Sequence, residues 1–291
     1  MPVTESPLDR LLLQSPFWLL GILILGAMIA AALIGWRARL WQNSARANSP
    51  EDDIGERQEG HIVAAVLGLL ALLTGFTFAL ALERYDTRRE RVLSEANAIG
   101  TTYLRTQLLA EPYRSRISSL LTDYADTRLQ LASASRTNEA RLLHRNDRSI
   151  IELWKATVAA FPTVKPYDFS NSYIEAMNAV IDSDAARKVA RKAHVPSEVY
   201  LVLLLYQFGT GFVLGYVLVG RNGRISAILL IVLFSTALLL IIDIDRPTTG
   251  WIRESQAPMI RLQEFLHANP PSTFGGQLPG TALRVPSGSG G

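Results

Sequence analysis

The chain has 291 residues, 48% of them apolar, and a formal net charge of only +3 at neutral pH. It contains no cysteine, which excludes disulfides, thiolate nucleophiles and cysteine-ligated metal. It also has no separate basic domain of the kind that binds nucleic acid. This apolar content is high for a water-soluble protein.

The apolar residues are concentrated in four blocks of roughly 18 to 22 residues without an acid or a base. At about 1.5 Å per residue, each block is long enough to cross a hydrocarbon layer of about 30 Å. A single block would also suit a buried core helix, but four together predict four membrane-spanning helices. The blocks are Phe17 to Trp36, Ile62 to Leu82, Val199 to Gly220 and Ile225 to Ile242.

The first block is expected to remain as an anchor and not to be a cleaved signal peptide. Its apolar run is too long for a signal peptide, and its leader holds a single base, Arg10. No clear cleavage site of small residues follows before Trp36 and Arg37.

The second span shows no helix stop signal until Glu111-Pro112. Apolar and aromatic residues recur at helical spacing beyond the span, and Arg88, Arg91, Glu95 and Arg105 are expected to face away from them. The span is therefore predicted to continue as a long helix for roughly 28 further residues, or about 40 Å. The spaced residues are Val92, Ala96, Ile99, Tyr103 and Leu104.

Three amphipathic helical patterns follow, and no strand pattern of useful length appears. Ser197 is expected to cap the third span, after a break at Val195-Pro196, and GRNGR at residues 220–224 is expected to be a tight turn. The three predicted helices run from Tyr113 to about Ala134, from about Asn138 to Ala160 with Pro162 ending the helix, and from Ser170 to about Ala193.

The predicted fold is an all-α membrane protein with four transmembrane helices. An all-helical cytoplasmic domain is inserted between the second and third spans, and the second span continues into it as a long helix. The predicted segments are two transmembrane helices with a polar loop (1–83), the helical domain (84–197), a transmembrane hairpin (198–245), a juxtamembrane helical tail (246–268) and a disordered tail (269–291).

The distribution of bases predicts the orientation in the membrane. More bases flank the spans on the side of the termini and of residues 84–197 than on the other side, which places this side in the cytoplasm. Arg37 and Arg39 oppose this trend, because they flank the first span more strongly than Arg10 does.

Small residues recur on the spans at spacings that suit close helix packing. Dense packing is the ordinary interpretation. The alternative is that small faces arrange helices around an axis, while Thr74, Phe76, Thr77 and Phe78 line or gate a pore. The small residues are Ala64, Gly68, Ala71, Gly75 and Ala79 on the second span and Gly211 and Gly215 on the third.

Charged residues gather where the second and fourth spans end on the same side. Acids at such a position need partners or water, so they indicate either an ion-pair belt or a charged vestibule at the cytoplasmic mouth of a conduit. The vestibule candidates are Glu83, Arg84, Arg88, Asp243, Asp245 and Arg246.

Enzyme signals are weak. The four histidines are scattered, and the chain has no HExxH motif, Walker loop or nucleophile elbow. No catalytic residue, metal site or cofactor is predicted.

Two stretches resemble the bacterial bestrophin-like domain family of membrane proteins, which is more distantly similar to bestrophins. They are GFTFALALERYDTRRERVLSEANAIGTTYLR at residues 75–105 and DIDRPTTGWIRESQAP at residues 243–258. Bestrophins are pentameric anion channels in which the second span lines the pore and narrows at a hydrophobic neck. In the animal members an acidic cluster after the fourth span binds calcium.

The resemblance implies that Phe76 and Phe78 are neck residues and that Arg84 or Arg88 faces permeating anions. Calcium activation is not implied, because Asp243, Asp245 and Glu254 do not form a run of acids.

The function expected from these features is an oligomeric membrane ion channel with its pore lined by the second span, and the resemblance favours anions. Its expected partners are the lipid bilayer, further copies of the chain and inorganic ions, in a bacterial inner membrane. The alternative function is a membrane-anchored scaffold or stress-sensing protein that acts through its cytoplasmic helical domain.

Overall fold

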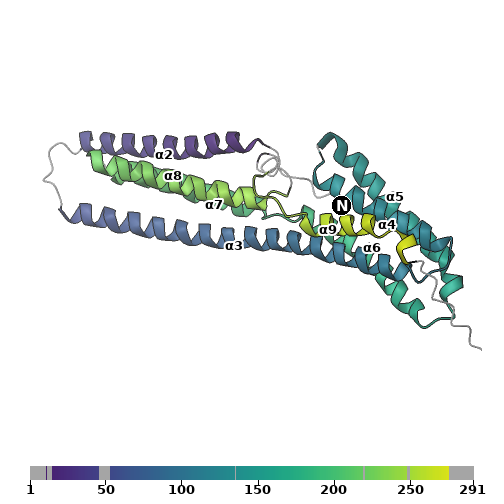
Figure 1. The fold of residues 1–291 in the computed structure, drawn as a ribbon. Coiled ribbons are helices and arrows are strands. Elements are labelled where there is room, and N and C mark those ends of the chain that lie inside the picture. Colours follow the sequence, from purple (N-terminus) through teal and green to yellow (C-terminus); the bar gives the residue numbers. More distant parts are fainter. Residues whose placement is uncertain are drawn as a thin grey trace, which may run out of the picture. The chain divides into compact units, whose positions relative to one another are not determined.

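The computed structural model of the protein describes residues 11, 15–45, 53–134, 136–218, 220–247 and 250–274. These residues fold into helices, with no strand among them (Figure 1). The all-α class predicted from the sequence is confirmed. The helices are α2 (Phe17–Ala45), α3 (Asp53–Thr106), α4 (Tyr113–Ala132), α5 (Arg136–Val164), α6 (Phe169–Lys192), α7 (Ser197–Val217), α8 (Gly220–Asp245), α9 (Ala257–Ala268) and α10 (Pro271–Phe274).

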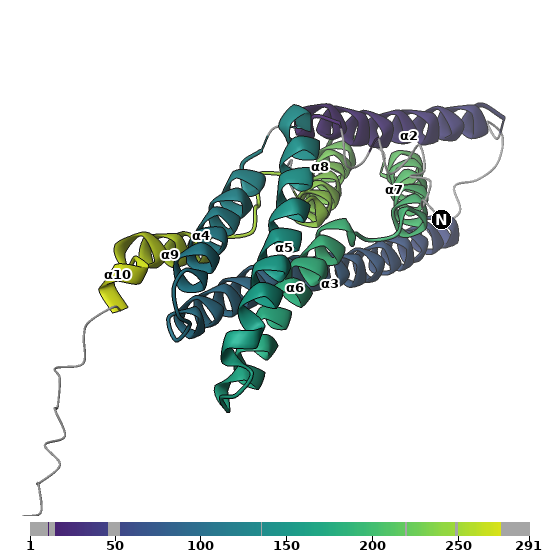
Figure 2. The same ribbon diagram turned by 90° about the vertical axis from the view of Figure 1, so that its right-hand side faces the viewer.

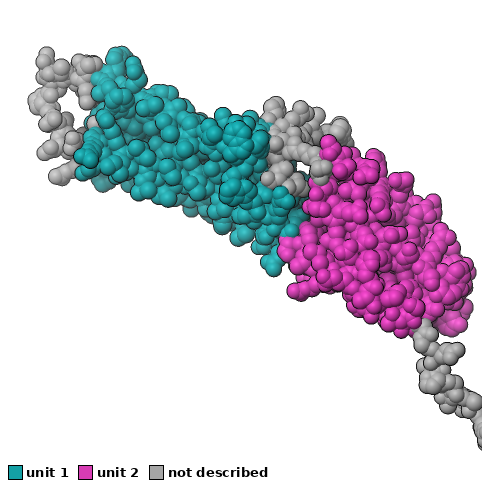
Figure 3. Space-filling view, turned by 45° about the horizontal axis from the view of Figure 1, so that its top comes forward, with its two compact units in different colours: residues 1–89, 189–254 teal, residues 90–188, 255–291 magenta. Residues whose placement is uncertain are grey.

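The chain divides into two compact units, which Figure 3 shows in different colours. Unit 1 consists of Met1–Arg89 and Val189–Glu254, and unit 2 consists of Glu90–Lys188 and Ser255–Gly291. Helix α3 contributes its first part to unit 1 and its last part to unit 2.

Unit 1 holds the apolar helices. Helices α2, α7 and α8 contact one another, and Leu70 and Ala81 of α3 join the same apolar core (Figure 1). Among the described residues, four helical stretches are long and apolar enough to cross a membrane, which agrees with the four predicted spans. These stretches are Phe17–Gln42, Gly60–Thr106, Phe169–Val217 and Gly220–Asp245.

The contact between α2 and α7 is built on glycines. A Cβ atom added to Gly35 would overlap the carbonyl oxygen of Phe212, and one added to Gly215 would overlap the carbonyl oxygen of Ala32. One added to Gly211 would lie 2.9 Å from the carbonyl oxygen of Met28. The lack of a side chain on these glycines thus lets the two backbones approach closely. Helices in lipid associate through such close packing, because no hydrophobic force drives them together there.

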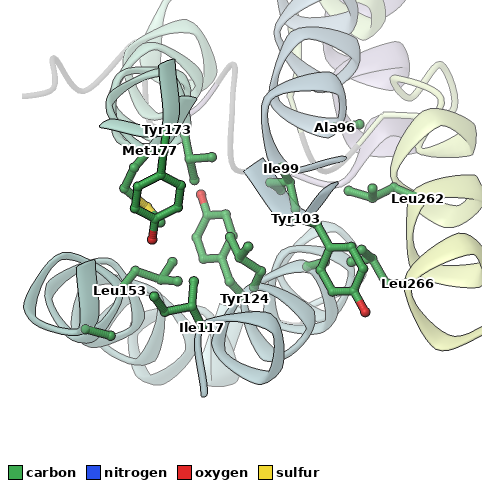
Figure 4. Close-up of a cluster of buried hydrophobic side chains, with 14 of the residues drawn as sticks. Ala96, Ile99, Tyr103, Ile117, Tyr124, Leu153, Tyr173, Met177, Leu262 and Leu266 are labelled. Atoms are coloured by element: carbon green, nitrogen blue, oxygen red, sulfur yellow. The ribbon is translucent and has the colours of Figure 1, made fainter. Parts of the chain in front are cut away.

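Unit 2 is a helical bundle around one apolar core. Figure 2 shows α4, α5 and α6 gathered with the last part of α3. In Figure 4, Tyr124 of α4, Leu153 of α5, and Tyr173 and Met177 of α6 converge, and Tyr103 of α3 faces Leu262 and Leu266 of α9. Amphipathic helices of this kind are stabilised mainly by burying their apolar faces against each other.

Three predicted boundaries were wrong for identifiable reasons. Helix α5 continues through Pro162 to Val164, because burial of Ala160 and Val164 in the core of unit 2 offsets the backbone hydrogen bond that proline cannot make. Pro196, not Ser197, occupies the N-cap position of α7. The GRNGR residues form the first turn of α8 rather than a linker, since the positive φ of Gly220 starts the helix earlier.

Two further ends differ from expectation. Helix α3 stops at Thr106, where the next three amides bond to carbonyls three residues back in a tightened turn, so it ends before Glu111-Pro112. Residues 271–274 of the expected disordered tail form α10, and residues 275–291 lie outside the described residues.

The α2–α7 contact generates a stability prediction. We expect Gly215→Ala to destabilise the protein by about 1–3 kcal/mol, because its methyl group must displace the backbone of α2. The midpoint of heat-induced unfolding of the purified protein in detergent measures this effect. Gly209→Ala, on the same helix with no atom within 4 Å of the added Cβ, is the matched control. Equal midpoints for the two variants would contradict the proposed contact.

Candidate functional site

Helix α3 presents two different faces within unit 1. Leu70, Thr77 and Ala81 are buried against the other helices of the unit. The small residues of the second span lie on the opposite face and are exposed, and no atom lies within 4 Å of a Cβ added to Gly68 or Gly75. This small-residue face consists of Ala64, Gly68, Ala71, Gly75 and Ala79. The face is therefore exposed among the described residues, although Ala71 and Gly75 at its edge also line a groove with α8.

The four pore candidates are not equivalent. Phe76 is the most exposed, at 62%, on the flank of the small-residue face. Thr77 is 1% exposed, and its hydroxyl donates a hydrogen bond to the carbonyl oxygen of Leu73 at 2.9 Å within its own helix. Phe78 and half-buried Thr74 line a groove of about 400 Å³ between α3 and α8. Both phenylalanines thus flank the small-residue face, and Phe76 is the more exposed of the two.

The vestibule candidates also differ in exposure. Glu83 and Arg84 are exposed, as a vestibule requires. The other four are buried inside unit 1, with Arg246 only 1% exposed. Those four are Arg88, Asp243, Asp245 and Arg246.

The buried carboxylates cap backbone amides. Asp243 accepts hydrogen bonds from the amides of Trp251 and Ile252, both at 2.9 Å, and so holds the segment that follows α8. Asp245 accepts from the amide of Val195 at 3.0 Å and from the hydroxyl of Tyr200 at 3.1 Å, at the start of α7. The two acids tie the end of α8 to its neighbours, which is the partnering that buried charges require.

Arg88 completes this polar cluster from α3. Its guanidinium donates to the carbonyl oxygen of Ile244 at 2.7 Å, and its Nε lies 3.3 Å from the Glu254 carboxylate. The side chain is 3% exposed, so it does not face an aqueous path in unit 1. Arg88 thus forms an ion pair with Glu254, whereas Asp243 and Asp245 bind backbone amides and a tyrosine hydroxyl. The burial of Arg88 does not support the role that the resemblance implies for it.

Unit 2 holds a second buried polar cluster, which the sequence analysis missed. The Glu95 carboxylate is 0% exposed and accepts hydrogen bonds from the Tyr124 hydroxyl at 2.6 Å and from the Arg187 guanidinium. It also forms an ion pair with Arg128, whose Nε lies 2.8 Å away. Arg187 also donates to the side-chain oxygen of Gln256 at 2.8 Å. This cluster joins α3, α4, α6 and the segment before α9 at a single carboxylate.

Asp184 forms the other half of that cluster. It accepts hydrogen bonds from the side chains of Asn146 at 2.8 Å and Lys188 at 2.6 Å. Its Oδ1 lies 3.5 Å from the Arg128 guanidinium, which connects it to Glu95. Burial and the Glu95 carboxylate raise the pKa of Tyr124 well above its usual range, so the hydroxyl stays protonated and donates.

The signal for Glu95 was present in the sequence. Val92, Glu95 and Ile99 are three and four residues apart, which places the acid on the apolar face of α3. The expectation that Glu95 and Arg88 face away from the apolar residues of α3 was wrong. Their position in the helical repeat, and not their charge, determines which face they occupy. Their partners come from distant parts of the chain and were not readable from spacing.

A metal centre finds no support in the geometry. Within the part of the chain that the structure describes, no group of three or more histidine, aspartate and glutamate side chains converges to hold a metal ion. Asp243 and Asp245 are occupied by backbone and tyrosine donors instead.

A family model for the Bestrophin-like domain matches residues 25–259, which is most of the chain. This protein belongs to the bestrophin-like family. None of the curated proteins matches it.

The bestrophin-like fold also appears in solved structures. Crystal structures of a bacterial bestrophin homologue from Klebsiella pneumoniae match, one with a tyrosine-to-alanine mutation at a TM-score of 0.60 and 16% identity, over 88% of this chain and 99% of that chain. Another, with an aspartate-to-alanine mutation, matches at 0.59 and 14% identity, over 88% of this chain and 100% of that chain. At such identities the likeness establishes the shared fold.

The Glu95 cluster of this bestrophin-like protein generates a prediction. Glu95→Gln leaves Arg128 and Arg187 buried without their carboxylate, so we expect a loss of about 3–5 kcal/mol in the free energy of unfolding. Denaturant unfolding of the purified protein in detergent measures the loss. Glu90→Gln, an exposed change on the same helix, is expected to behave like wild type. A Glu95→Gln variant as stable as Glu90→Gln would disprove the role of Glu95.

Proposed function

We propose that this bestrophin-like protein is one subunit of a homo-oligomeric ion channel in which the uncovered faces of several α3 helices surround the conducting path. The observation that carries this proposal is the exposure of the small-residue face of α3. The other apolar helices of unit 1 cover the side that holds Leu70, Thr77 and Ala81, and α8 also borders a groove with Ala71 and Gly75 at the edge of the small-residue face.

A small-residue face gains little packing energy when it contacts lipid alone. Glycine and alanine offer few contacts to acyl chains, whereas they let neighbouring backbones approach or leave room for a path between helices. Phe76, on the flank of the same face, is the large exposed side chain that narrows such a path. Apolar constrictions of this kind gate channels by excluding water.

Anions are the proposed permeant ions, on the strength of the family resemblance. Arg84 is the exposed base that follows the apolar part of α3, with Glu83 beside it. Charged side chains at a path's mouth tune which ions enter. Arg88 is not part of this proposal, because it is buried.

The proposed location is the bacterial inner membrane. The excess of arginine and lysine near the span ends places both termini and the helical segment 84–197 on the cytoplasmic side. Lipid, further copies of the chain and inorganic ions are the partners that this location supplies.

One observation favours the alternative function of a membrane-anchored scaffold. Unit 2 has a groove of about 510 Å³ between α3 and α9, with Leu93, Gly100 and Phe265 among its lining residues. Apolar grooves of this size receive ligands or partner side chains. A scaffold, unlike a channel, requires no ion flux.

Liposomes that contain the purified protein test the channel proposal. We expect ion flux from an oligomer whose subunit number is first counted in detergent, and we expect Phe76→Ala to increase the flux severalfold because it widens the proposed constriction. Phe78→Ala is the matched control, since Phe78 lines the α3–α8 groove.

The outcomes separate the alternatives. An absence of flux from a well-folded oligomer would overturn the channel proposal and favour the scaffold. Flux that rises equally in Phe76→Ala and Phe78→Ala, or in neither variant, would remove the assignment of Phe76 as the constriction.

A further inference from the structure

A second groove lies within unit 1, between α2 and α8, with a cavity volume of about 440 Å³. Ala32, Gly215 and Ala227 are among its lining residues, so small side chains give it depth. Its apolar walls include large exposed side chains from both helices, namely Ile29, Leu33, Ile228 and Val232.

A positively charged side chain lies at one end of this groove. Arg224 is exposed and also lines the groove, and its guanidinium carbon lies 5.4 Å from the ring centre of Trp36. The stacking holds the guanidinium beside Trp36 of α2 and at the start of α8, where the apolar spans give way to polar residues. No carboxylate of the described residues pairs with Arg224.

The same end of unit 1 is basic and aromatic. Arg37 and Arg221 are exposed there, and the Arg39 guanidinium stacks over Tyr216 at 5.3 Å. Tryptophan, tyrosine and arginine at the ends of spans are typical of the headgroup level of a bilayer. The groove is thus apolar along its length and positively charged at its mouth.

We propose that this groove, the α2–α8 groove, binds an anionic phospholipid. One acyl chain lies along the apolar walls, and the Arg224 guanidinium donates to the headgroup phosphate. An amphiphile is the ligand class that matches an apolar slot with a single cationic end. The planar guanidinium suits the phosphate because it donates two parallel hydrogen bonds.

The size of the groove favours a lipid chain over a helix from another copy. A helix with its side chains is about 10–12 Å across and needs a wide groove. The α2–α8 groove has a volume of about 440 Å³, which is at the lower end of the range for small-molecule sites. The exposed walls also lie on the apolar helices, where lipid is the solvent.

Native mass spectrometry of the full-length oligomer in detergent tests the site, with added phosphatidylglycerol or phosphatidylcholine. We expect phosphatidylglycerol to be retained more strongly, and Arg224→Gln to bind it about fivefold more weakly, the effect of one arginine at an anionic surface. Arg221→Gln serves as the control, because Arg221 lies on the same turn but outside the groove lining. This variant is expected to lose less affinity for phosphatidylglycerol than Arg224→Gln.

A second pair of variants tests the apolar slot. Ile228→Trp is expected to fill the groove and reduce phosphatidylglycerol retention, whereas Leu229→Trp, equally exposed but outside the lining, is expected to retain the lipid. Inorganic phosphate added in excess is expected not to displace the lipid, because it lacks the chain that the groove holds.

Four results would overturn the proposal. Equal retention of the two lipids would remove the preference for an anionic headgroup, because both lipids carry a phosphate, and an unchanged affinity in Arg224→Gln would remove the phosphate contact. Displacement by inorganic phosphate would reassign the site to a free anion. A change in subunit number in Ile228→Trp, without a change in lipid retained per subunit, would show that a second copy of the chain covers the groove.

Discussion

The structure depends on the division of α3 into a covered face and an uncovered face within unit 1. A helix in lipid satisfies its own backbone, so its position is decided by which side chains pack against other helices. Leu70, Thr77 and Ala81 pack inside the chain, and the small-residue face that holds Gly68 and Gly75 does not. Gly35 of α2 and Gly211 and Gly215 of α7, in contrast, are in close contact with backbone of the same chain. This contrast is the basis for placing further copies, or a path between them, at α3.

Buried charged side chains connect both parts of α3 to neighbouring helices. Arg88 ties α3 to the end of α8 in unit 1, and Glu95, two turns later, ties it to α4 and α6 in unit 2. Buried ion pairs contribute little net stability against an apolar core, but the loss of one partner is costly. Such clusters fix one arrangement of helices, which suits a helix that has to present a defined face.

Much of this fold was readable from the sequence. The four apolar blocks predicted the spans, because length and the absence of charge suffice in a membrane, and the lack of a stop signal predicted the long α3. The end of α5 and the start of α8 were predicted wrongly from Pro162 and the GRNGR turn, because tertiary packing and one positive φ determined these two boundaries. The burial of Arg88 and Asp245 was not readable, because spacing shows which face a residue occupies and not which distant groups meet it there. Only the structure separated Phe76 from Phe78 among the pore candidates.

The absence of cysteine makes one measurement especially direct. Ala79→Cys on the small-residue face and Ala81→Cys on the covered face each introduce the sole thiol of the protein, two residues apart on α3. In liposomes, a charged, membrane-impermeant thiol reagent is expected to modify Ala79→Cys and to block ion flux, and to leave Ala81→Cys unmodified. An unreactive thiol at position 79, or one that reacts without any change in flux, would contradict the account that this face of α3 lines a water-filled path.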